Sequence, residues 1–270
     1  MKRVWLTILG SVSAFVAAGP LLTISAQSGG TIEGHVKLTG TPRPNAVIQM
    51  GADPNCLKIN AGKRVVQQTV VTAPDGGLLN AFVNVKGSFP QTAVPPAPAV
   101  IEQQGCVYHP RVQGVRVGQT LEVKNSDATL HNIHSLSTKG SGFNVGQPLA
   151  GMVYKYQLKT EEVMLHVRCD VHSWMTGYLG VVPHPYFAVT DAAGTFTIAN
   201  VPAGKQTVQV WHEQYGALAQ TVDVKAGGTT TVEFAYTGNE KPSQTAFAVQ
   251  ELVVPVDATA VQLIASRRRD

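Results

Sequence analysis

The sequence predicts an all-β protein built from two β-sandwich units. Glycine and proline are abundant, with 26 and 16 copies among 270 residues, and charged residues make up only 14%. Outside the N-terminus no long segment carries the apolar stripe of an amphipathic helix, whereas several short segments alternate apolar and polar side chains. The length exceeds that of one small domain and is sufficient for two units, each with its own core.

The N-terminal half contains the first predicted strands. Residues 31–38 alternate apolar and polar side chains and end at a Gly-Thr-Pro turn, and further strands are expected over 65–71 and 81–85. We assign this strand region to the first unit. Four prolines between 89 and 98 predict an exposed loop, because proline cannot donate to a β-ladder.

Two later strands deliver polar residues to the core side of the first unit. In 115–125 the alternating apolar positions end in Asn125, and in 163–169 they end in Cys169. A hairpin signal at 191–194 then opens the second unit. The predicted segments are a signal (1–26), a first sandwich (27–183), a second sandwich (184–236) and a tail (237–270) that adds a strand, binds a partner or is disordered.

Residues 1–26 predict a secretory signal. Two basic residues precede the apolar stretch 4–24, which ends in a passable small-residue cleavage site. The stretch is nearly long enough to stay as a membrane anchor, so membrane contact is expected only without cleavage. We expect a periplasmic or extracellular protein. Removing 1–26 lowers the net charge from +4 to +2, which does not indicate nucleic-acid binding.

Two short motifs carry the chemistry. The first is N-S-D-A-T-L-H-N at 125–132, and the second is C-D-V-H-S-W-M at 169–175. Together they offer two imidazoles, one thiolate and one thioether. This set is typical of copper electron-transfer sites, because thiolate and thioether suit Cu(I) while imidazole also suits Cu(II). One tight loop can fold around an ion while a neighbouring strand end supplies the other imidazole.

The pattern N-x-D-x-x-x-H-N followed by C-x-x-H-x-x-M resembles the cupredoxins, and its short second loop resembles that of amicyanin. The resemblance covers residues 65–183 and implies a Greek-key β-sandwich. It also implies one mononuclear copper ion held by His131, Cys169 and His172, with Met175 as a weak axial ligand.

The resemblance extends to residues around the ligands. It implies that the backbone N–H of Asn132 points at the sulfur of Cys169, a contact that tunes the reduction potential. The side chain of Asn125 is expected to hydrogen-bond across the two ligand loops. Electrons are expected to leave through His172, on a loop near the surface.

The chain beyond the ligand loop carries a second resemblance. Residues 169–213, with W-M-T-G-Y at 174–178 and V-W-H at 210–212, resemble bacterial proteins labelled methylamine-utilisation-like. In these, a cupredoxin is joined to a carboxypeptidase-regulatory-like sandwich, which implies a transthyretin-like second unit. Nothing here resembles a quinone or flavin site, so the resemblance implies electron carriage and not amine oxidation.

The sequence also contains residues for other metal sites. A structural zinc site has four Cys or His ligands, and Met is a poor ligand for zinc, so these motifs do not predict a zinc site. His134 is a reserve candidate, but three residues along a strand place it on the face opposite His131, so a polar surface histidine is the expectation. Cys106 and His109 could form a second metal site. In an oxidising compartment Cys56 and Cys106 more often form a disulfide, which is the prediction here.

The predicted function is one-electron transfer between exported redox proteins, such as a c-type cytochrome or a dehydrogenase. No bond-making catalysis is expected, since a His-x-His cluster for the further copper ions of a multicopper oxidase or nitrite reductase is missing. Two other classes stay open: a non-redox copper carrier or storage protein, and a structural binding module that copper only stabilises. The copper carrier would need an exposed, exchangeable ion.

Overall fold

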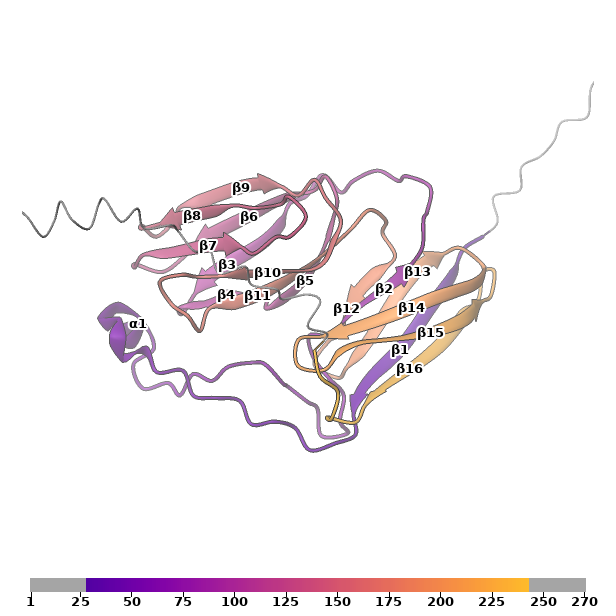
Figure 1. Cartoon of the computed structure of the whole chain (residues 1–270), viewed down its shortest axis with the longest axis horizontal. Helices are drawn as coiled ribbons and strands as arrows, with labels where there is room; N and C mark the ends of the chain where they lie inside the picture. Colours follow the sequence, from indigo (N-terminus) through magenta and orange to yellow (C-terminus); the bar gives the residue numbers. More distant parts are fainter. Residues whose placement is uncertain (1–27, 243–270) are drawn as a thin grey trace, which may run out of the picture.

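The computed structural model describes residues 28–242 and confirms the all-β fold (Figure 1). Two β-sandwiches lie side by side, each with two sheets. Within the described residues the only helices are the 3-10 turn η1 (Met50–Ala52) and the short α1 (Pro54–Ile59), and neither could cross a membrane. The predicted signal (1–26) and residues 243–270 of the predicted tail lie outside the described part.

The first sandwich packs a five-stranded sheet against a four-stranded sheet. The five-stranded sheet has the order β5 (Val112–Arg116), β11 (Thr176–Val182), β10 (Glu162–Arg168), β7 (His131–Ser135), β8 (Asn144–Gln147). The four-stranded sheet has the order β4 (Val107–His109), β3 (Ala99–Gln104), β6 (Thr120–Asn125), β9 (Val153–Gln157). The registers place the loops 126–130, 148–152 and 169–175 at one end of this sandwich.

The second sandwich is assembled from distant parts of the chain. Its three-stranded sheet has the order β13 (Thr195–Val201), β1 (Gly30–Leu38), β16 (Thr229–Tyr236). Its four-stranded sheet has the order β12 (Phe187–Val189), β2 (Phe82–Lys86), β14 (Gly204–His212), β15 (Gly216–Val224). Between residues 28 and 242 the chain therefore begins in this sandwich, forms the first one, and returns.

Assigning the N-terminal strand region to the first sandwich is wrong. Strand β1 lies between β13 and β16, and its Ile32, Val36 and Leu38 are buried in the core of the second sandwich. The strand predicted over 81–85 exists as β2, but it pairs with β12 and β14. Alternation of apolar residues predicts which face of a strand is buried and does not identify the neighbouring strand.

The strand predicted over 65–71 is absent, and the segment instead forms part of an irregular arm. Val66 makes only an isolated bridge with Val47. The backbone N–H groups of Thr69 and Val70 donate to the side chain of Asn45, both at 3.0 Å. A side chain thus satisfies donors that a neighbouring strand would otherwise satisfy.

The two sandwiches contact each other closely. A Cβ atom on Gly180 of β11 would come within 2.3 Å of the Phe82 ring from β2, so only glycine lets this ring lie on the backbone of the first sandwich. Arg111 beside β5 pairs with Glu213 after β14, with Nη2 and Oε2 2.8 Å apart. Apolar packing and a largely buried ion pair therefore join the units.

The buried His212 is expected to make the free energy of unfolding depend on pH. Burial, with a smaller effect of Arg111, lowers the pKa of His212 to about 3, and Nε2 of this fully buried ring has no partner among the described residues. An unfolded histidine has a pKa of about 6.5, so below that pH protons favour the unfolded chain. The stability that neutral His212 provides is complete above pH 6.5, and about 2 kcal/mol is lost by pH 5.

The measurement is urea unfolding of the purified protein at pH 7 and pH 5, for the wild type and for His212→Gln. Glutamine does not titrate, so the variant is expected to lose about 2 kcal/mol less than the wild type between these two pH values. An equal loss in both proteins would show that His212 is not the group responsible.

Candidate metal centre

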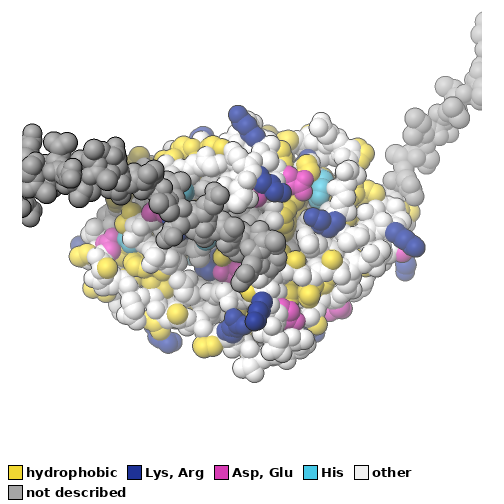
Figure 2. Space-filling view, in the orientation of Figure 1, with side chains coloured by type: hydrophobic (Ala, Val, Ile, Leu, Met, Phe, Trp, Pro, Cys, Tyr) yellow, Lys and Arg dark blue, Asp and Glu magenta, His cyan; other side chains and the backbone are white. Residues whose placement is uncertain are grey.

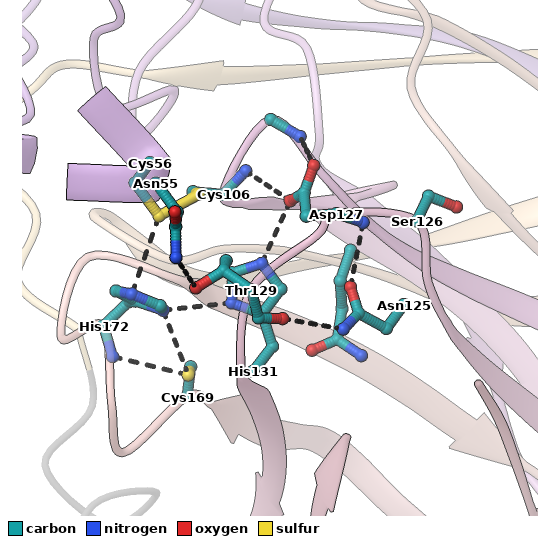
Figure 3. A network of polar contacts seen from close by, with 12 residues as sticks. Asn55, Cys56, Cys106, Asn125, Ser126, Asp127, Thr129, His131, Cys169 and His172 are labelled. Carbon is teal, nitrogen blue, oxygen red and sulfur yellow. Dashed lines mark hydrogen bonds and ion pairs between the residues drawn. A yellow bond between two sulfur atoms is a disulfide. The ribbon is translucent and has the colours of Figure 1, made fainter. Parts of the chain in front are cut away.

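Three potential ligands meet at the end of the first sandwich that carries its loops (Figure 3). His131 opens β7, Cys169 follows the last residue of β10, and His172 lies in the loop that leads to β11. The Nδ1 atoms of the two rings are 3.0 Å apart, and Nδ1 of His172 lies 3.8 Å from Sγ of Cys169. All three residues are at most 1% exposed. One ion could touch all three ligand atoms, which lie within 4.8 Å of one another.

The loop around Cys169 is closed by its own backbone. The N–H of Cys169 donates to the carbonyl of Met175 at 3.0 Å, and the N–H of Met175 donates to the carbonyl of His172 at 2.9 Å. Met175 is fully buried in the same apolar core as Cys169. These bonds bring all three loop residues together, and axial coordination by the Met175 sulfur stays a prediction.

The environment of Cys169 favours its thiolate. The backbone N–H groups of Asn132 and His172 donate to Sγ at 3.5 and 3.4 Å. Burial by itself raises the pKa of the thiol, but these two bonds and a hydrogen bond from His131 outweigh it, so the pKa lies below its ordinary value. The metal-binding form of the sulfur is therefore the stabilised one.

Each imidazole is held by a carboxylate at its other nitrogen. Nε2 of His131 lies 3.0 Å from Oδ2 of Asp127, and Nε2 of His172 lies 2.8 Å from Oδ2 of Asp53. The Nδ1 atoms are left to face Cys169. Although burial lowers the pKa of His131, Asp127 and Cys169 raise it to a value above the ordinary one. Such outer partners orient metal-binding imidazoles and increase their basicity.

The two carboxylates differ in how far the sequence could reveal them. Asp127 belongs to the motif four residues before His131, but its contact with the ring was not predicted. Asp53 is separated from His172 by 119 positions and lies in a Gly- and Pro-containing segment without strand periodicity. No local signal in the sequence connects Asp53 with the ligands.

The backbone N–H of Asn132 points at the sulfur of Cys169 as predicted, whereas the side chain of Asn125 does not have its expected role. The Asn125 side chain donates to the carbonyls of Thr129 at 2.9 Å and Gln147 at 2.8 Å, and thus ties the first ligand loop to β8. The predicted bond of Asn125 across the two ligand loops is not among these contacts. Asn132 makes that link, because its side-chain oxygen accepts the N–H of Asp170 at 2.6 Å.

His172 lies on a loop near the surface, but its ring is buried. Electron exit through this ring stays a prediction. The ring is covered by Asp53 and by Sγ of Cys56, which lies 3.6 Å from Nε2. The predicted disulfide is present between Cys56 and Cys106, so a second metal site using Cys106 and His109 is excluded.

His134, the reserve ligand, points elsewhere. Its Nδ1 lies 2.9 Å from Oδ2 of Asp170, and the ring is partly exposed. Among the described residues, the groups of possible ligands that lie close together do not include His134.

The donor set fits copper. Two imidazole nitrogens and a thiolate, with a buried methionine in the same core, combine ligands suited to both common oxidation states. Because both outer ring nitrogens are bound to carboxylates, the nitrogens that face the sulfur are the ones available to a metal.

Part of the second sandwich matches a known domain family. Residues 181–237 match the carboxypeptidase regulatory-like domain family. This regulatory-like segment contains β12 to β16. Strands β1 and β2, which complete the two sheets, lie outside the match. A comparison with curated proteins found no match.

Several copper proteins are among the solved structures that are similar to this chain. A purple cupredoxin from Nitrosopumilus maritimus is 25% identical over 31% of this chain and 98% of its own (TM-score 0.26). A Cu(I) amicyanin mutant is 19% identical over 37% and 97% (TM-score 0.28). A copper-containing nitrite reductase from Thermus scotoductus SA-01 is 21% identical over 35% of this chain but only 24% of its own (TM-score 0.28). The TM-scores are low, so the case for the metal centre depends on its own geometry.

Proposed function

We propose that this protein is a mononuclear copper electron carrier. The observation that carries the proposal is the buried trio of His131, Cys169 and His172, with both outer ring nitrogens bound to carboxylates. Bound copper would supply one-electron chemistry by alternating between Cu(II) and Cu(I).

The protein's own residues favour electron transfer over a chemical reaction of a substrate at the metal. The rings are held at their outer nitrogens by carboxylates, and the sulfur is held by two backbone N–H groups, so the ligands need to move little between oxidation states. The ligand residues are almost fully buried, which leaves no open face for a substrate. We therefore assign no enzymatic reaction to this site.

Exposed apolar side chains supply a docking surface for a redox protein. They surround the ligand end of the first sandwich: two directly precede the ligand histidines, two lie in the loop 148–152, and one lies on α1 beside the disulfide. These residues, here called the apolar end, are Leu57, Leu130, Leu149, Met152 and Val171, from 37% to 67% exposed. Clustered exposed apolar residues typically mark interaction sites.

The proposed partners are exported redox proteins such as a c-type cytochrome or a dehydrogenase. On the face seen in Figure 2, acidic and basic side chains are scattered among uncharged ones, which suits a mainly apolar contact better than nucleic acid. The Cys56–Cys106 disulfide supports an oxidising compartment, periplasmic or extracellular.

Leu149→Lys is expected to slow electron exchange with a c-type cytochrome. The side chain is 67% exposed at the apolar end, and a lysine there adds a charge that must be desolvated on docking. We expect the second-order rate constant, measured by stopped-flow absorption, to fall about tenfold, which corresponds to 1.4 kcal/mol.

Val100→Lys is the matched control for Leu149→Lys. Val100 is 39% exposed near the start of β3, at the opposite end of the sandwich from the ligands. Its rate constant is expected to stay at the wild-type value. Equal effects of both variants would reject docking at the apolar end.

A non-redox copper carrier is favoured less by the site. Such a protein needs an exchangeable ion, whereas the ligand residues here are at most 1% exposed and His172 is covered. Slow loss of copper to a chelator, on the scale of hours, is expected for an electron carrier, and rapid complete loss would favour the copper carrier.

A further inference from the structure

A short N-terminal segment covers the metal centre although it lies far from the ligands in sequence. Residues 50–60, here called the cap, contain η1 and α1, and the disulfide from Cys56 fixes them to Cys106 beside β4. The Asn60 side chain strengthens this attachment by donating to the carbonyls of Cys56 and Gly105, both at 3.0 Å. The cap is therefore a fixed element and not a loose loop.

Asp53 uses its two carboxylate oxygens for different purposes. Oδ1 accepts the N–H groups of Asn55 at 2.7 Å and Cys56 at 3.2 Å, and so caps the N-terminus of α1. Oδ2 lies 2.8 Å from Nε2 of His172 and accepts the hydroxyl of Thr129 at 3.2 Å. One oxygen thus shapes the cap, and the other reaches the ligand.

We propose that Asp53 is a positioning residue of the metal centre, which fixes His172 with Nε2 protonated and Nδ1 directed at Cys169. This inference rests on the proposed function for its meaning. Asp127 holds the other ligand ring, His131, in the same way, so each imidazole has one carboxylate. Carboxylate partners of this kind select the ring nitrogen that binds metal.

The cap also closes the outer edge of His172. The side chain of His172 is only 2% exposed, because Asp53 and the sulfur of Cys56 lie against Nε2. Access to the centre by water or a chelator past this ring therefore requires the cap to move. Asp53 connects the two effects, since the same carboxylate forms the cap and orients the ligand.

Two substitutions separate the positioning role from the capping role. Asp53→Ser retains an N-cap residue for α1 but is too short to reach His172. Asp53→Asn keeps the side-chain length but has no charge and only one acceptor oxygen, so it cannot serve both α1 and His172. Asp75→Asn is the control, because Asp75 also accepts a backbone N–H, at 3.2 Å from Gly77, but lies in the second sandwich.

The first readout needs no copper. In copper-free protein labelled with ¹⁵N-histidine, the shifts of the ring nitrogens report which one carries the proton. We expect a single Nε2–H form of His172 in the wild type and in Asp75→Asn. A mixture of both tautomers is expected in Asp53→Ser and in Asp53→Asn, since neither keeps an acceptor for both α1 and Nε2.

The second readout is the copper-loaded protein. Copper affinity, measured by chelator competition, is expected to fall about 10- to 100-fold in Asp53→Ser. The reduction potential is expected to rise in both Asp53 variants, because removing a negative charge favours Cu(I). Asp75→Asn is expected to change neither quantity.

The proposal is overturned if Asp53→Ser keeps the wild-type tautomer and an affinity within about twofold. Should Asp53→Ser fail to fold, an unchanged reduction potential in Asp53→Asn overturns it. Failure of the proposed function is distinguishable: the wild type would then show no thiolate-to-copper band, while the nitrogen shifts still test the role of Asp53.

Discussion

Replacing Cys56 and Cys106 together by serine is expected to lower the free energy of unfolding by about 4 kcal/mol. The disulfide closes a loop with a sequence separation of 50, and a cross-link of that span restricts the unfolded chain by about this amount. The measurement is urea unfolding of the copper-free variant against the oxidised wild type at pH 7. A loss below about 1 kcal/mol would contradict the expectation.

The same variant is expected to release copper faster. Without the bond to Cys106, α1 is attached to the first sandwich mainly through the hydrogen bonds of Asn60 and Asp53, so the cap can open. Wild-type protein treated with a thiol reductant is the control, since it keeps its sequence and should behave like the double variant. Equal release rates in oxidised and reduced wild type would show that the cap does not limit exchange.

Cys169→Ser is expected to abolish the intense visible band of the Cu(II) protein. A hydroxyl can still accept the N–H groups of Asn132 and His172, so the loop should fold, but it cannot supply the thiolate charge-transfer transition. The measurement is visible absorption after addition of Cu(II), with near-ultraviolet circular dichroism to verify folding. An unchanged band would show that the sulfur of Cys169 is not a ligand.

His134→Gln is the matched control for Cys169→Ser. His134 lies near the ligands but is paired with Asp170, so the variant is expected to keep the band and its intensity. Loss of the band would mean that the reserve ligand coordinates after all. If the Cys169→Ser protein kept the full function of the wild type, a structural binding module would be favoured over an electron carrier.

The sequence predicted the parts of the site that local pattern determines. The three ligands stand at strand ends or in one tight loop. Strand alternation and short spacing were therefore enough to predict that His131, Cys169 and His172 lie close together. The cap could not be predicted in this way. Asp53 reaches His172 only because a disulfide and an irregular arm fold a distant segment over the ring, and neither leaves a periodic signal.

The fold shows the same division between local and distant information. The all-β class followed from alternation and turn residues, and β2 was found close to its expected position. The parallel pairing of β1 with β16 joins residues almost 200 positions apart, for example Thr31 with Thr229. A strand's own sequence reveals its buried face, but the choice of partner depends on the whole fold.

The most direct test of the copper centre is titration of the purified metal-free protein with Cu(II), followed by visible absorption and electron paramagnetic resonance. We expect one equivalent to produce an intense thiolate-to-copper band with narrow hyperfine splitting, as a His₂Cys ligand set should give. A second equivalent should not increase the band. Binding without this band, or no binding at all while Cys169 is intact, would contradict the proposed electron-transfer centre.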